Sequence, residues 1–212
     1  MLGERGFLVK EDFYEKVHRC KVIKENLKDN DELMKVTFKV KDDLETFHIF
    51  CDKSAKETSR VKFLSYEKFP DGIFIVHNKD GSIDCHICEL KRNPTNNLKN
   101  LSLQLFCGYL HCKLFLTTLE LNDKDINYNY NVFMIKGYDK EEDYRRLPNT
   151  PMKISPGKKI IKESDYDDWK NNRVRLEENG VELLDVSVNK YTLREIEDTD
   201  DLIKEFHYTL AI

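Results

Sequence analysis

The sequence lacks three features that would each assign it to a class of proteins. No run of about 18 apolar residues occurs, so no transmembrane helix is expected. The first ten residues contain no apolar stretch long enough for a signal peptide, which predicts a chain that is not exported. Glycine and proline together number 13 of 212 residues without any low-complexity tract, which excludes a collagen-like repeat and argues against long disordered linkers.

An excess of positive charge is also absent. The chain has 35 basic and 39 acidic residues and a formal charge of −4, which excludes a protein that coats nucleic acid by charge alone. Residues 1–115 carry 20 Lys/Arg against 18 Asp/Glu, whereas residues 116–212 carry 15 against 21. We therefore expect any polyanion to bind a local patch in the first part, while the acidic second part offers a surface for a protein partner.

Six cysteines are present, and in an unexported chain they are expected to be reduced thiols in a cytoplasmic protein. Cys85 and Cys88, together with Cys107, His111 and Cys112, invite a zinc or iron–sulfur interpretation. However, Cys85 and Cys88 are three residues apart on a predicted strand and so project to opposite faces. We therefore favour buried core thiols.

An apolar content of 40% is enough for one sizeable core, and hydrophobic periodicity predicts an α/β chain. The clearest feature is a β-hairpin over residues 69–92, in which Asp80-Gly81 supplies the turn, followed by a helix over residues 98–117. The other expected elements are an opening helix at 11–26, a hairpin formed by 33–40 and 44–50, strands at 130–138, 158–161 and 181–188, and a closing helix at 200–208.

The hairpin gathers acidic and basic residues at one end. With Asp80 and Gly81 as a two-residue turn, the residue numbers of two residues that face each other across the hairpin add up to about 161, which places Asp71 opposite Glu89 or Leu90. Glu89 and Lys91 then share one face of their strand, while the Leu90 side chain enters the core. Asp84, the other nearby acid, would project to the opposite face from Glu89.

Two carboxylates at one site repel each other unless they share a proton or a cation. Mg²⁺ or Mn²⁺ would resolve this, because hard cations bind carboxylate and carbonyl oxygens, here those of Asp71, Glu89 and the Leu90 backbone. Lys91 would then lie where it can orient a water and stabilise charge on an attacked phosphate. These residues point to phosphodiester hydrolysis.

Pro70-Asp71, seventeen intervening residues and Glu89-Leu90-Lys91 resemble the signature of the PD-(D/E)xK nuclease superfamily. The resemblance implies a restriction-endonuclease-like αβββαβ core, a mixed sheet flanked by helices, over roughly residues 11–136. It implies a metal-dependent nuclease, with DNA favoured over RNA, in which Asp71 and Glu89 bind metal and Lys91 is catalytic. Gln104 matches a glutamine that many members carry on the next helix, and Glu15 is the candidate for an acid that some relatives add from the first helix.

The resemblance divides the chain into a nuclease core at residues 1–138 and an acidic α+β extension at 139–212, packed on the same domain. It suggests a role in genome defence or repair, and whether the chain forms a homodimer stays open. One alternative is a catalytically inactive nuclease fold that serves as an interaction module. A second is an RNA endonuclease of the cap-snatching type, which would use a helix histidine, here His18.

Overall fold

The structure is a computed structural model, and it describes residues 9, 13–27, 32–50, 68–121, 124–135, 163–196 and 204–212. These residues form two mixed β-sheets, two α-helices and a short 3₁₀-helix. The α/β class predicted from the sequence is confirmed. The strands are β1 (Tyr14–Val17), β2 (Cys20–Leu27), β3 (Glu32–Lys39), β4 (Glu45–Ile49), β5 (Gly72–His77), β6 (Ile83–Lys91), β7 (Ile126–Met134), β8 (Arg173–Glu178), β9 (Val181–Thr192), β10 (Arg194–Glu195) and β11 (Lys204–Ala211). The helices are η4 (Pro94–Asn97), α1 (Leu98–Thr118) and α3 (Glu163–Lys170).

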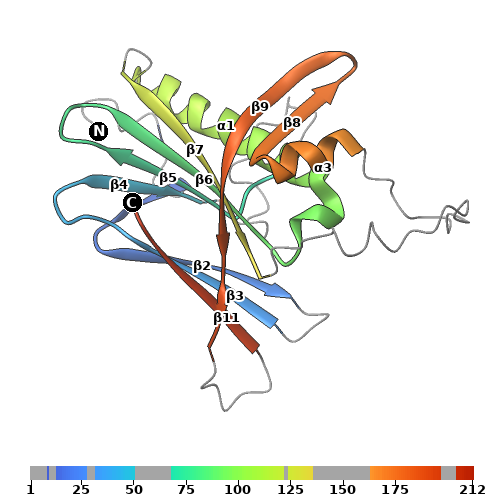
Figure 1. Cartoon of the computed structure of the whole chain (residues 1–212). Coiled ribbons are helices and arrows are strands. Elements are labelled where there is room, and N and C mark those ends of the chain that lie inside the picture. The colour runs from blue at the N-terminus through green and yellow to red at the C-terminus, as the bar shows by residue number, and fades with distance from the viewer. Residues whose placement is uncertain are drawn as a thin grey trace, which may run out of the picture.

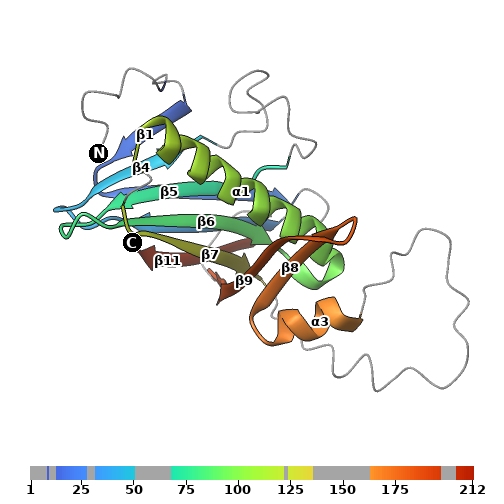
Figure 2. The ribbon, with the colours of Figure 1, turned by 90° about the horizontal axis from the view of Figure 1, so that it is seen from above.

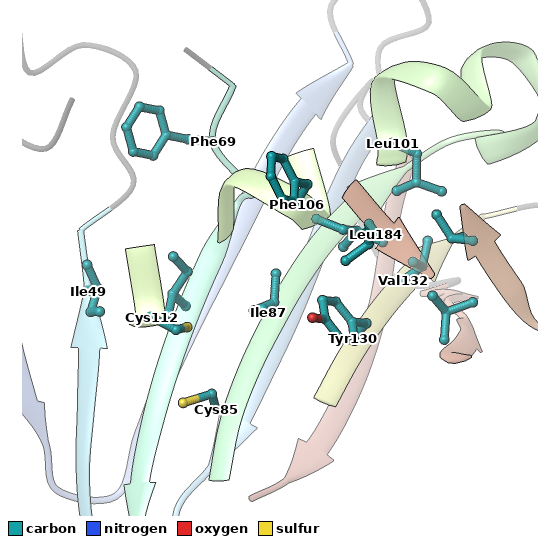
Figure 3. Close-up of a cluster of buried hydrophobic side chains, with 14 of the residues drawn as sticks. Ile49, Phe69, Cys85, Ile87, Leu101, Phe106, Cys112, Tyr130, Val132 and Leu184 are labelled. Carbon is teal, nitrogen blue, oxygen red and sulfur yellow. The ribbon is translucent and has the colours of Figure 1, made fainter. Parts of the chain in front are cut away.

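The molecule has three layers, with the larger sheet in the middle (Figures 1 and 2). This seven-stranded sheet has the order β1-β4-β5-β6-β7-β9-β8, and the smaller sheet has the order β10-β11-β3-β2. Figure 3 shows one core, in which Ile87 and Val132 of the large sheet face Leu101 and Phe106 of α1. The second core fills the space between the two sheets. Both faces of the central strands are thus buried, which explains their continuous apolar runs.

The hairpin around Asp80-Gly81 is confirmed, but its loop is one residue longer than expected. The Asn78 N–H donates to the Ser82 carbonyl at 2.9 Å, so Lys79, Asp80 and Gly81 form a three-residue loop. Gly81 has a φ of +87°, as expected for a type I turn that ends in a left-handed residue. Paired positions therefore add up to 160, as in Gly72 opposite Cys88.

The helix after the hairpin is confirmed as α1. The Asn97 side chain accepts a hydrogen bond from the Asn100 N–H and caps the first turn. Gly108 lets this helix approach the sheet, because a Cβ there would lie 2.5 Å from Ile87 Cγ2 and 3.0 Å from Pro70 Cγ. The close contact fixes the height of α1 above β6.

The predicted opening helix at residues 11–26 is wrong. Its described part, residues 13–26, contains β1 and most of β2, edge strands of different sheets, with the chain bending at His18 and Arg19 between them. Edge strands carry charges that block unwanted strand pairing. In β2 only Ile23 is buried, so the period-two signal is weak and the helical spacing of Phe13 and Val17 misleads.

Two further predictions need correction. The closing helix at 200–208 is wrong, because Lys204–Ala211 is the strand β11, which pairs in parallel with β3. The segments 33–40 and 44–50 are strands as predicted, but β3 and β4 belong to different sheets and form no hairpin.

The later strands are partly confirmed. The strand expected at 130–138 is β7, which begins four residues earlier, and that expected at 181–188 is the first part of β9. The strand predicted at 158–161 lies outside the described residues. β9 joins the large sheet beside β7, and β11 joins the small sheet. The domain boundary near residue 138 stays a prediction.

Candidate functional site

The hairpin brings Asp71 against the backbone of the Glu-Leu-Lys segment. Asp71 immediately precedes β5, and continuing the register by one residue places it opposite Glu89. Its Oδ2 accepts a hydrogen bond of 2.7 Å from the Leu90 N–H. The sequence-based pairing of Asp71 with Glu89 or Leu90 is therefore confirmed, even though the loop differs.

Glu89 and Lys91 lie on the α1 face of the sheet, on the same side as Ile87. The Glu89 side chain is fully buried, and the Lys91 side chain is 25% exposed. The Lys91 Nζ donates to Glu89 Oε1. A buried carboxylate requires such a positive partner, because taking an unpaired charge out of water costs several kcal/mol.

Leu90 contributes its side chain to the core and its backbone to the site. The side chain is buried between the two sheets, as predicted. Within a strand, the N–H and C=O of one residue point to the same edge, so the Leu90 carbonyl is directed toward the Asp71 side. Gly72 is opposite Cys88, so continuing the register by two residues places Pro70 opposite Leu90. Proline has no N–H, so this ladder position supplies no donor to the Leu90 carbonyl.

Gln104 of α1 lies at the same end of the hairpin. Gly108 lies against Ile87. Gln104 is one helical turn before Gly108 and therefore lies near the level of Glu89. The buried Gln104 side chain donates from Nε2 to the Phe69 carbonyl at 3.2 Å, and its Oε1 accepts from Asn100 Nδ2 at 2.7 Å. Gln104 therefore holds the segment that leads into Asp71.

Glu15 does not join this group. It lies on β1, where Oε1 accepts from His48 Nδ1 at 3.0 Å and pairs with Lys21. Glu15 is opposite His48, which is opposite Phe74, and Phe74 faces the second sheet. Glu15 therefore projects from the face opposite to that of Glu89. His18, expected on a helix, lies at an exposed bend between β1 and β2.

The donors at the hairpin end fit a hard divalent cation in chemical type. They are two carboxylates and a backbone carbonyl, all oxygen, and such cations complete their coordination with water. Among the described residues, no group of three or more His, Cys, Asp or Glu side chains is arranged to hold a metal. Any cation here would therefore rely on Asp71, Glu89, the Leu90 carbonyl and solvent.

Four of the described cysteines are core residues, whereas Cys20 is exposed. Cys85 faces the α1 core and Cys88 the core between the sheets, which confirms that they project to opposite sides. Both are buried, as are Cys107 and Cys112. His111 uses Nδ1 to contact the Cys107 carbonyl at 2.7 Å within its own helix.

Lys190, a basic residue near this region, is not predicted from the sequence. Val132 of β7 lies opposite Glu89 on one side and opposite Lys190 of β9 on the other, so all three project from one face. The Lys190 Nζ donates to the Trp169 carbonyl and lies 4.0 Å from the Trp169 ring centroid. Burial lowers the pKa of Lys190 to about 8. Only the register between β7 and β9 reveals this row.

No known family, curated protein or solved structure matches the chain. Among the described residues, no helix is long and apolar enough to cross a membrane.

Proposed function

We propose that the chain is a Mg²⁺- or Mn²⁺-dependent nuclease whose site consists of Asp71, Glu89 and Lys91. The observation that carries this proposal is the hydrogen bond from the Leu90 N–H to Asp71, because it joins the acid before β5 to the Glu-Leu-Lys end of β6. DNA is favoured over RNA by the sequence resemblance alone. A role in genome defence or repair belongs to the same proposal, as does a cytoplasmic location.

The chain's own residues have distinct tasks in this reaction. Asp71 and Glu89 would hold the cation with the Leu90 carbonyl, and Gln104 fixes the backbone before Asp71. When bound, the cation would activate water and polarise the phosphoryl oxygen. Cation binding at Glu89 would weaken the Glu89–Lys91 pair, so that the Lys91 ammonium can orient the attacking water and offset charge on the phosphate.

Cleavage of labelled single- and double-stranded DNA and RNA with Mn²⁺ tests the proposal. We expect Glu89→Gln and Lys91→Met to lower the rate by about 100-fold or more, as losing a charged group at the transition state typically does. Asp84→Asn is the matched control, because Asp84 lies on the same strand but projects to the opposite face. Its Oδ2 accepts from Asn78 at 2.8 Å and its Oδ1 from Asn127 at 3.0 Å, away from the candidate site. Absence of cleavage of every substrate by the unmodified chain would refute the proposal.

Thermal unfolding measures cation binding without catalysis. A ligand at 100 times its Kd stabilises the folded chain by about 2.7 kcal/mol, so Mn²⁺ should raise the unfolding temperature. The rise should disappear in Asp71→Asn and persist in Asp84→Asn. A chain that neither binds Mn²⁺ nor cleaves nucleic acid would instead fit the alternative of an inactive nuclease fold that contacts a protein partner.

A further inference from the structure

The outer face of the four-stranded sheet carries a row of basic residues. Neighbouring strands pair Lys24 with Lys35, Lys35 with His207 and His207 with Arg194. Directly paired residues project to the same side, and these point away from the core between the sheets. The row crosses all four strands and spans about 14 Å, at roughly 4.8 Å per strand.

Charge on this face is strongly one-sided, although the whole chain is acidic. Among the described residues, Lys24, Lys35, Lys39 and Arg194 share this face with one acid, Glu205, which gives +3 with His207 counted as neutral, on a chain of net −4. Glu205 pairs with Lys35. Among the described residues, no carboxylate forms an ion pair with the other three cations. These are Lys24, Lys39 and Arg194, all of them exposed.

Basic residues near the candidate nuclease site are instead paired. Lys91 contacts Glu89, Arg92 contacts Glu32, and Lys99 contacts Glu178. The charges of these three residues are thus locally compensated. Among the described residues, Lys24, Lys39 and Arg194 instead gather on one face of the four-stranded sheet without an ion pair to a carboxylate.

Edge protection does not account for this face. Lysine on an edge strand such as β2 guards against unwanted strand pairing. Lys35 and Lys39, however, lie on β3, an interior strand with neighbours on both sides. Between the cations, Thr209 adds a hydroxyl group that can donate to phosphate oxygens, while the Thr37 hydroxyl forms a hydrogen bond of 2.9 Å with His207 Nε2.

We propose that the outer face of the four-stranded sheet binds the phosphate backbone of nucleic acid. Among the described residues the face bears no Phe, Tyr or Trp ring for base stacking, so contacts to phosphate dominate and the binding is independent of sequence. An anionic membrane is disfavoured, because the exposed large apolar residues here, Val22 and Ile196, are too few to insert into lipid.

This face lies in the layer opposite to α1, with the seven-stranded sheet between them (Figure 1). Asp71 and Glu89 are on the α1 side of that central sheet. The basic face and the candidate nuclease site are thus on different layers. Binding at the basic face does not rest on the proposed nuclease activity, and either can fail without the other.

Fluorescence anisotropy with a 20-base-pair DNA duplex in EDTA tests the inference without cleavage. The face variant is Lys24→Gln/Lys39→Gln/Arg194→Gln, which neutralises the three cations of the face that pair with no carboxylate in the described part of the chain. Each lost phosphate contact lowers the slope of log K against log[salt] by about 0.9, so we expect a decrease of up to about 2.7. Affinity at 0.1 M salt should fall by roughly tenfold or more.

A matched control removes the same charge elsewhere. Lys113→Gln/Lys124→Gln/Lys170→Gln neutralises three exposed lysines outside the face and should keep the original slope to within one contact. An RNA duplex of the same sequence distinguishes the two sources of phosphate backbone. The inference is overturned if the face and control variants show equal slopes and affinities. It is also overturned if the chain binds phosphatidylserine vesicles but neither duplex.

Discussion

Acidification should destabilise the chain through His48, a histidine buried beside Glu15. The side chain of His48 is 8% exposed, and its ring lies 4.9 Å from that of Phe74. Nδ1 faces Glu15 Oε1 at 3.0 Å, whereas Nε2 is buried and has no hydrogen-bond partner among the described residues. A neutral ring that donates from Nδ1 fits this environment, and a charged ring would bury a second donor without an acceptor.

The size of this loss of stability follows from the pKa of His48. Burial lowers this pKa from 6.5 to about 4, although the hydrogen bond to Glu15 acts in the opposite direction. Above pH 6.5 both the folded and unfolded chains hold the ring neutral. As the pH falls from 6.5 toward 4, the unfolded chain takes up the proton first, and stability is lost. Between pH 7.5 and 5 this amounts to about 2 kcal/mol, and below pH 4 the total approaches about 3 kcal/mol.

Urea unfolding at pH 7.5, 6 and 5 measures this loss, and the fluorescence of the single, buried Trp169 reports the transition. His48→Phe keeps a ring between Phe74 and Phe50 and removes the titration. The difference in unfolding free energy between His48→Phe and the unmodified chain should therefore shift by about 2 kcal/mol over this range. Burial also lowers the pKa of His86, but that contribution is common to both chains and cancels. A difference that stays constant with pH would refute the reasoning.

Three other substitutions test how the hairpin end is built. Gly108→Ala should destabilise the fold by about 1–3 kcal/mol in urea unfolding, because its Cβ would meet Ile87 and Pro70; an unchanged midpoint would show that α1 can shift freely. Asn97→Ala should cost about 1 kcal/mol by removing the α1 cap, whereas Asn97→Asp should retain most of the stability. Arg92→Met should lower the free energy of unfolding by about 1–2 kcal/mol, because Arg92 donates to both carboxylate oxygens of Glu32. The double variant Arg92→Met/Glu32→Gln no longer leaves a carboxylate without its partner and should recover part of this loss. An Arg92→Met chain as stable as the unmodified one would show that the pair contributes nothing to stability.

Local signals in the sequence suffice for the hairpin and α1. The alternation on either side of Asp80-Gly81, the Pro94 start and the Asn97 cap all act over a few residues. They place Asp71 beside Leu90 and put Glu89 and Lys91 on one face. A one-residue error in the loop does not alter this grouping, because the Asp71 side chain reaches the next backbone N–H.

Elements that depend on distant pairing were predicted poorly. The helical spacing of Leu202, Ile203 and Phe206 predicts a helix where β11 lies, although Phe206, Tyr208 and Leu210 alternate toward the core between the sheets. Its parallel contact with β3 leaves no trace in local sequence. The same holds for Glu15, which the sequence pattern places on a helix and which lies on β1 instead. The basic row likewise emerges only from three separate strand registers.

The interior position of β11 has a consequence for synthesis on the ribosome. Lys35 of β3 and its partner Glu205 of β11 are 170 residues apart. At 5–20 residues per second, β3 waits on the order of ten seconds or more for β11 to be made. Until then, β2 and β3 form only a two-stranded hairpin, which is marginally stable by itself. The edge of β3 that later pairs with β11 therefore stays unpaired in the nascent chain, and we expect chaperones to shield this edge until β11 is made.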